Sequence, residues 1–249
     1  AVRSGIPIPF HFTSDMAGQP KTLVIKGNVI LDSVEEWNWE KASGSMIVEL
    51  KQLSLNNAAQ KGIGPSPKGA LFFKGGQIDT LIEIKKKANE AFLELTATGA
   101  GMGIAYEISQ DQAWIAAPVL DATWGARAAW NNDTSELKLH KASIKLPFGE
   151  VEANGSMKLN TGEIAAIHIA GLNMALEDLL KYCPGLENAL PFHVGFSGSG
   201  KWVLSMEGTR DHLSLHFAWD LAKVLLSYGQ YFTKPKDIPL DLNLDLLLQ

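Results

Sequence analysis

Three things are scarce in this sequence: cysteine, long apolar runs and excess positive charge. Its 249 residues include one cysteine, Cys183, so no intrachain disulfide can form. A single cysteine suits a reducing compartment and, equally, a bacterial envelope protein that folds without disulfides. No stretch approaches 18 consecutive apolar residues, the length that indicates a membrane-spanning helix, so we expect no such helix in this chain.

The net charge of −5 at pH 7 narrows the classes of partner. A nucleic-acid-binding protein needs a basic surface for the phosphates, so we expect no nucleic-acid partner. The same charge argues against electrostatic docking on anionic lipid. Hydrophobic residues at 46% and charged residues at 20% are typical of a folded soluble domain, and the chain is long enough to bury a sizeable core.

Apolar and polar residues alternate in segments that restart along the chain. A period of two is typical of strands that have one apolar face and one solvated face. The sequence therefore predicts a mainly β protein with a large curled antiparallel sheet, as an open groove or a barrel-like form, in one domain spanning residues 1–249. The clearest apolar sets are Leu23, Ile25, Val29 and Leu31; Leu93, Leu95 and Ala97; Trp202, Leu204 and Met206; and Leu240, Leu242, Leu244, Leu246 and Leu248.

Turn residues divide the pattern into short strands. Helical spacing replaces alternation in two places, which predicts short helices over 173–183, with Asn173 as the N-cap, and over 220–230. The expected strands cover roughly 21–31, 36–49, 69–74, 77–85, 90–98, 103–109, 112–118, 135–146, 149–159, 163–170, 191–197, 201–207, 212–219 and 238–248.

A weak internal repeat accompanies this pattern. Ile167-His168-Ile169-Ala170 returns as Leu215-His216-Phe217-Ala218, and each copy precedes one of the two expected helices. Repeated strand units favour an extended sheet over a closed globule.

One motif resembles a nucleotide-binding phosphate loop, but the residues after it do not fit such a loop. The stretch from Gly195 to Lys201 fits G-x-x-x-x-G-K, but Trp202 stands where a phosphate loop has Ser or Thr, and a strand pattern follows where a helix is needed. We expect a glycine-rich hairpin turn there instead.

Residues suited to metal binding or nucleophilic catalysis do not form a site either. His212 and His216 on one strand would lie about 13 Å apart, too far for a single zinc ion. Cys183 closes a helix, where the dipole disfavours a thiolate, and Glu35 and Glu36 point to opposite faces of any strand. We therefore expect no enzyme activity, no cofactor and no metal.

Two features bear on ligand binding. The run Lys85-Lys86-Lys87 is interpreted as a solvated turn, with contact to a lipid head group as the alternative. Seven tryptophans favour a packed core, with an aromatic surface that binds sugar or lipid as the alternative. These tryptophans are Trp37, Trp39, Trp114, Trp124, Trp130, Trp202 and Trp219.

The region from Gly149 to Leu226 carries a family resemblance. Strands punctuated by glycine, Gly155-Ser156-Met157-Lys158-Leu159 among them, flank a leucine-rich segment that closes in Cys183-Pro184-Gly185. After it comes Ser197-Gly198-Ser199-Gly200-Lys201-Trp202-Val203-Leu204. This pattern resembles the AsmA-like and TamB-like envelope proteins of Gram-negative bacteria, and is similar to the small type II secretion protein N group.

The resemblance implies a curled sheet whose apolar groove holds or passes lipid acyl chains in outer-membrane biogenesis or secretion. It also implies a periplasmic location, with any inner-membrane anchor in a segment outside this chain. The alternative is a β-sandwich module that assembles with other proteins of an envelope or secretion complex; an enzyme is the least favoured hypothesis.

Alternation assigns the groove lining within each strand, and we expect the chosen residues to share one face of the sheet. The segment from Ile238 to Leu248 alternates most cleanly, so we expect an edge strand that extends the groove or pairs with another chain, against an ordinary core strand. The expected lining residues are Leu23, Ile25, Val29, Leu93, Leu95, Trp202, Leu204, Met206, Leu213, Leu215 and Phe217.

Overall fold

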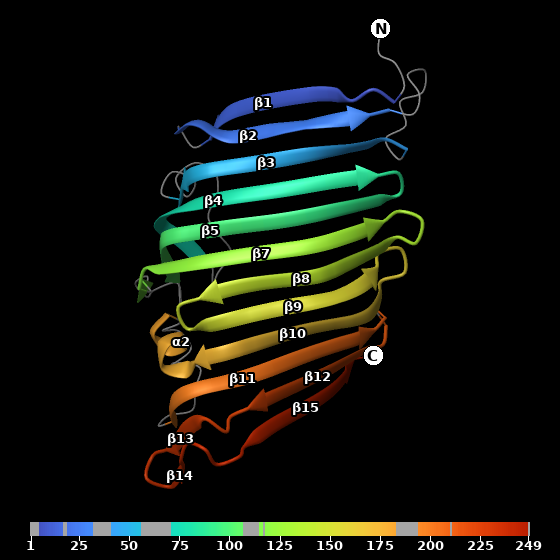
Figure 1. Cartoon of the computed structure of the whole chain (residues 1–249). Helices are drawn as coiled ribbons and strands as arrows, with labels where there is room; N and C mark the ends of the chain where they lie inside the picture. The colour runs from blue at the N-terminus through green and yellow to red at the C-terminus, as the bar shows by residue number, and fades with distance from the viewer. Residues whose placement is uncertain are drawn as a thin grey trace.

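The computed structural model describes residues 5–16, 19–31, 41–55, 71–106, 115–116, 118–182, 194–209 and 211–248. Its strands form one large antiparallel sheet, and twelve of them lie side by side along its main path (Figure 1). These twelve, in spatial order, are β1 (Ile8–Met16), β2 (Gln19–Ile30), β3 (Ser43–Ser54), β4 (Leu71–Lys87), β5 (Glu90–Tyr106), β7 (Leu120–Asn131), β8 (Glu136–Leu146), β9 (Gly149–Lys158), β10 (Glu163–Ala175), β11 (Val194–Gly208), β12 (Leu213–Asp220) and β15 (Asp241–Leu248).

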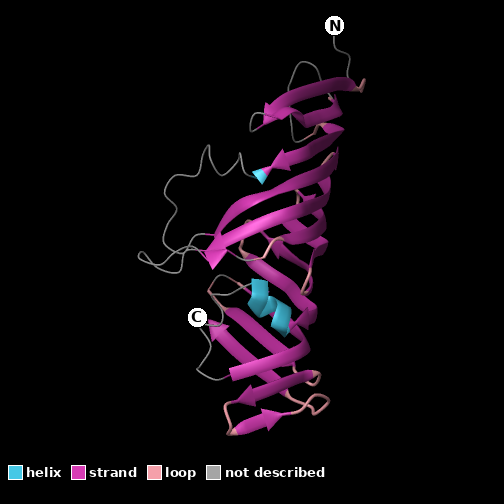
Figure 2. Ribbon diagram, turned by 90° about the vertical axis from the view of Figure 1, so that its left-hand side faces the viewer, coloured by secondary structure: helices cyan, strands magenta, loops and turns pink. Residues whose placement is uncertain are grey.

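Three short strands lie off this path. β6 (Ile115–Ala116) pairs with β5, β13 (Val224–Tyr228) pairs with the first residues of β11, and β14 (Phe232–Lys234) pairs with β13. A short helix, α2 (Leu176–Tyr182), follows β10 and lies on one side of the sheet (Figure 2).

The mainly β, antiparallel prediction is confirmed, in its open form. β1 and β15 lie at opposite ends of the sheet and pair with β2 and β12, so the sheet does not close into a barrel (Figure 1). The described strands make a single layer, whereas a sandwich needs two sheets packed face to face.

The first expected helix is confirmed in place, but it begins at Leu176 instead of Asn173. Asn173 has φ of 51° inside β10, at a point where the register with β11 shifts, so it forms a bulge instead of a cap.

The second expected helix, over 220–230, is wrong. Val224–Tyr228 is the strand β13, and Asp220 accepts a hydrogen bond from the Ala222 amide in the turn before it. Pairing with Val194–Gly198 satisfies the backbone of this segment, so non-local contacts override its helical spacing.

The glycine-rich hairpin turn expected at 195–201 is also wrong, because these residues lie inside β11. Gly198 has φ of 109°, and a Cβ there would overlap the Lys223 carbonyl oxygen. A residue without a side chain therefore lets β11 turn from its partner β13 to its partners β10 and β12.

Several expected strands merge or were missed. Within the described residues, the segments predicted as 69–74 and 77–85 form β4, those predicted as 90–98 and 103–109 lie along β5 as far as Tyr106, and the two around 195 and 204 form β11. β1, β7 and the β13–β14 hairpin were not predicted.

Two small buried clusters lie at the strand ends beside α2. One packs Leu176, Leu221 and Val224 together, with Trp219 and Leu240 against them. The other joins Leu55, Met102, Leu120 and Ala122, with Tyr182 of α2 among its neighbours. The core of the described residues is thus local, and much of the sheet carries no packed layer from them.

Candidate functional site: the apolar face of the sheet

The strand register assembles one continuous apolar face. Residues that pair directly across antiparallel strands point to the same side, so the chain of pairs from β1 to β15 defines a row. We call this the central row, and all twelve of its side chains are apolar. It consists of Phe12, Ile25, Val48, Ile82, Leu95, Ala126, Ala142, Ala153, Ile169, Leu204, Phe217 and Leu244.

A second row runs beside it on the same face, two residues along each strand and three along β8. It also has no polar side chain. It consists of Phe10, Gly27, Met46, Ile84, Leu93, Ala128, Leu139, Gly155, Ile167, Met206, Leu215 and Leu246.

All eleven predicted lining residues lie on this face. Ile25, Leu95, Leu204 and Phe217 belong to the central row, and Leu93, Met206 and Leu215 to the second. The other four lie on the same face, further along their strands than either row: Leu23, Trp202, Val29 and Leu213. The structure thus brings the predicted set together on one side, while its role in binding lipid stays a prediction.

β-bulges keep the face continuous where strict alternation would break it. In β8 the apolar face passes from Leu139 to Ala142, because His140 and Lys141 together oppose Asn154 of β9. In β10 it passes from Ile164 to Ile167 across a similar shift. The two extra residues put later side chains back on the apolar side.

The described residues leave much of this face open to solvent. Phe12 is 54% exposed, Leu93 36%, Ile144 43% and Leu244 52%. The packed clusters cover the part of it near the strand ends beside α2. This helix lies on one side of the sheet (Figure 2). Exposed apolar area of this extent is typical of a surface that binds something apolar.

Small side chains occupy the middle of the face. Five positions on β7, β8 and β9 form what we call the alanine strip: Ala126, Ala128, Ala142, Ala153 and Gly155. Larger residues border it, among them Leu95 on β5 and Ile169 on β10. In the second row Leu139 of β8 lies between Ala128 and Gly155, so the unbroken part of the strip is Ala126, Ala142 and Ala153 of the central row. This part leaves room on the face between two bulky flanks.

Sequence reasoning missed this strip, although a signal was present. Along β7, Ala122, Trp124, Ala126, Ala128 and Trp130 alternate with other residues, which is a period of two built from alanine and tryptophan. Alanine is a weak marker of strands, so the pattern carried little weight.

The described tryptophans all lie on the apolar face. Trp124 and Trp130 flank the alanine strip on β7, and Trp202 and Trp219 pair across β11 and β12. Trp202 lies over Gly171, where a Cβ would overlap its indole nitrogen. Trp37, Trp39 and Trp114 lie outside the described residues, as do Cys183, Glu35 and Glu36.

A pocket of about 440 Å³ opens at the end of this face beside the β4–β5 turn. Phe10, Met46, Ile84 and Trp130 are among its walls. Lys86 also lines it, and its Nζ donates hydrogen bonds to the carbonyl oxygens of Ala42, at 2.8 Å, and Ala88, at 2.7 Å. The solvated turn expected for the lysine run is wrong: Lys85, Lys86 and Lys87 lie in β4 and the turn follows at Ala88 and Asn89, while Lys86 faces a mostly apolar pocket.

The opposite face carries charge. Cross-strand pairs join Lys26 to Glu49, at 2.7 Å, and Arg127 to Glu94, also at 2.7 Å. Lys26 and Lys51 both donate to Glu49, which lowers the pKa of this carboxyl to about 2.

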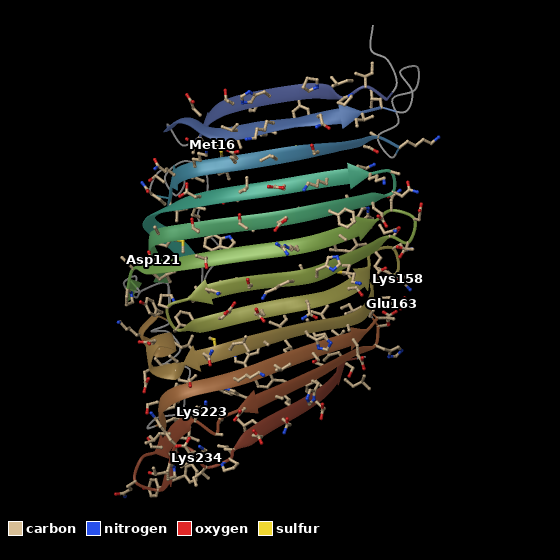
Figure 3. All side chains as sticks on the ribbon, in the orientation of Figure 1. Met16, Asp121, Lys158, Glu163, Lys223 and Lys234 are labelled. Atoms are coloured by element: carbon tan, nitrogen blue, oxygen red, sulfur yellow. The ribbon has the colours of Figure 1, made fainter. Side chains whose placement is uncertain are left out.

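Two further pairs continue this charged face. Glu152 raises the pKa of Lys141, and Glu163 raises that of Lys158, chiefly through hydrogen bonds. Lys158 and Glu163 meet at the turn between β9 and β10 (Figure 3).

One row of the charged face has the residue types of a hydrolase. Ser205, His216 and Asp245 are neighbours across β11, β12 and β15, and His216 Nδ1 lies 2.6 Å from the Asp245 carboxylate. However, the Ser205 hydroxyl shares its 2.9 Å hydrogen bond with His168. β11 is paired on both sides at Ser205, so its backbone amides are committed to the sheet and cannot stabilise an oxyanion.

Two features are absent from the described residues. No group of three or more His, Cys, Asp or Glu side chains among them is arranged to hold a metal ion. Nor does any helix in that part of the chain have the length and hydropathy needed to cross a membrane.

Comparison with known proteins names no relative. The chain matches no family model, no curated protein and no solved structure. The apolar face is thus the feature on which a function is proposed, and the resemblance to AsmA-like and TamB-like proteins stays a prediction.

Proposed function

We propose that this protein is a non-enzymatic carrier that holds lipid acyl chains along the apolar face of its sheet. The observation that carries the proposal is the central row, which crosses all twelve strands of the main path without one polar side chain. An open apolar surface of this length is costly in water, and its burial against a ligand is favourable.

The shape of the face favours hydrocarbon chains over a compact ligand. Neighbouring strands lie about 4.8 Å apart, so the central row extends over about 50 Å. The central and second rows together form a band two side chains wide, flanked by further apolar positions on the same strands. Hydrocarbon needs no directional partner and contributes about 0.8 kcal/mol for each CH₂ buried, which suits rows that offer no hydrogen bond.

The alanine strip and the pocket support the same ligand. Small residues between bulky flanks give an acyl chain contact on three sides. At the pocket, Lys86 places a cation beside apolar walls, which fits a lipid whose anionic head lies next to its chains. The periplasmic location implied by the family resemblance belongs to this proposal.

Organic extraction of the purified protein, followed by mass spectrometry, tests whether lipid co-purifies. A photoreactive residue in place of Leu95 or Leu204 should label a lipid probe strongly. The same residue in place of Glu94 or Ser205, the neighbours on the charged face, should label it weakly. Equal labelling from both faces contradicts the proposal.

Filling the alanine strip gives a matched functional test. Ala153→Phe places a large ring on the apolar face and should reduce bound lipid severalfold. Ala170→Phe makes the same change on the charged face of the next strand and should leave bound lipid unchanged. Retention of lipid by Ala153→Phe would show that the strip is not where the chains lie.

The second candidate function is a module that assembles with other envelope proteins. The exposed edge of β15 favours it, since every residue from Asp241 to Leu248 is exposed. Affinity capture from envelope extracts tests this candidate: a partner that is lost when β15 carries Asn243→Pro would support it.

A further inference from the structure

The two edges of the sheet have unlike chemistry. Within the described residues, β15 pairs only with β12, and β1 pairs only with β2. β15 runs without a register shift, and its charges are the carboxylates Asp241 and Asp245. Edge strands are usually protected by Lys, Pro or a bulge; β15 has none of these, whereas β1 has Pro9 and a bulge after Ser14.

We propose that β15 of one copy pairs with β1 of a second copy, so that the chains associate head to tail. The twelve strands of the main path alternate in direction, which makes β15, in twelfth place, antiparallel to β1. A second copy placed beyond β15 in the same orientation therefore continues the antiparallel sheet.

The apolar rows end in matching residues at the two edges. The central row ends in Phe12 and Leu244, and the second row in Phe10 and Leu246. One register brings both row ends together and continues both rows into the second copy. In that register Ile8 opposes Leu248 and Ser14 opposes Leu242.

The same register also sets polar side chains opposite each other on the other face. Asp245, whose side chain is 81% exposed, comes opposite His11, and Asn243 comes opposite Thr13. The one like-charge pair in this register is Asp15 opposite Asp241, at the point where a bulge after Ser14 interrupts the regular pairing of β1 with β2.

Pairing of two β15 strands with each other is disfavoured in the register centred on Asn243. An antiparallel pair centred on Asn243 sets Asp241 of each copy against Asp245 of the other. Like charges directly opposite each other destabilise a sheet. A head-to-tail contact does not close on itself, so the expected products are chains of protomers that lengthen with concentration.

Cysteine crosslinking in a Cys183→Ser background tests the proposed pair. One preparation carries Thr13→Cys, and another, with a different tag, carries Asn243→Cys. Oxidation of the mixture should give a heterodimer that carries both tags. Thr96→Cys, on the charged face in the middle of the sheet, is the control and should not crosslink with either.

The crosslinks also separate the alternatives. Crosslinks only between two Asn243→Cys chains would show pairing of β15 with itself and overturn the proposal. So would a sample that sediments as a monomer at every concentration.

A negative charge introduced at position 11 gives a second, independent test, in which sedimentation measures how strongly the chains associate. His11→Asp faces Asp245 with a like charge and should weaken association roughly fivefold. His140→Asp, an exposed histidine in the middle of the sheet, should have no effect, and mixing His11→Asp chains with Asp245→Lys chains should restore association. No loss in His11→Asp contradicts the register, and neither measurement depends on bound lipid.

Discussion

The two faces of the sheet are built from the same strands, but only the charged face has partners for its side chains, in ion pairs and in water. On the charged face, Lys26 meets Glu49 and Arg127 meets Glu94, with water around them. On the apolar face, rows of Leu, Ile, Phe and Ala extend over twelve strands, and the buried clusters cover only the end near α2. A charged face needs no further partner, whereas an open apolar face does.

The largest difference between the faces should appear on introducing a carboxylate. Val224 is fully buried in the cluster beside α2, and Val224→Asp should cost about 4 kcal/mol or more, because the charge has no water and no partner. Val203→Asp puts the same group on the charged face and should cost about 1 kcal/mol or less. Urea denaturation measures both, and equal losses would remove the distinction.

A carboxylate on the open part of the apolar face should reduce lipid binding more than it reduces the stability of the fold. Leu204→Asp interrupts the central row, so bound lipid should fall about tenfold, as expected when roughly 1.4 kcal/mol of binding free energy is lost. Ser205→Asp, one residue along, faces the other side and should retain lipid. Quantitative lipid extraction from the two variants decides whether the faces differ in function.

Glycines on the two faces should differ in what they tolerate. At Gly171 a Cβ would overlap the Trp202 indole, so Gly171→Ala should destabilise the fold by about 2 kcal/mol and shift the tryptophan fluorescence. Gly125 lies on the charged face, and its nearest neighbour to a new Cβ is the Leu95 carbonyl oxygen at 3.4 Å. Gly125→Ala should change stability little; a loss as large as that of Gly171→Ala would argue against the described Trp202 packing.

The smallest effect concerns the ion pairs of the charged face. The pKa of Glu49 is lowered to about 2, so the carboxylate stabilises the folded state above its ordinary pKa of 4.5. This contribution is lost as the pH falls from about 4.5 through 2. Glu49→Gln should cost about 1 kcal/mol or less at pH 7, because the pair lies at the surface, and should cost much less at pH 2, where half of the Glu49 carboxyls are protonated in the folded state.

Urea midpoints for the wild type and Glu49→Gln across this pH range measure the difference. A constant difference at all pH values would contradict the assignment to the Glu49 charge. High salt at pH 7 should also reduce it.

The sequence pattern predicted sides better than it predicted boundaries. Leu95 and Leu204 were assigned to one face by alternation alone, and the register places them in one row. Alternation works because successive strand residues point to opposite sides whatever the strand pairs with. It could not foresee the bulge at His140 and Lys141, since a bulge is defined by the strand opposite.

Helical spacing was a weaker guide. It found α2, where Leu176 is buried by contacts with residues far along the chain. It failed at Val224–Tyr228, where the same spacing lies in a strand because β11 supplies the backbone partners. A segment of this length has too few local interactions to fix its own conformation.

The sequence by itself determined that this protein is a mainly β, antiparallel structure with one apolar and one charged side, because side-chain alternation is a local property of extended backbone. Only the tertiary structure decided that the sheet stays open, that Ala126, Ala142 and Ala153 meet in a strip, and that β1 and β15 form its edges. These features depend on which strands pair and in which register, and pairing is set by contacts between residues distant in the chain.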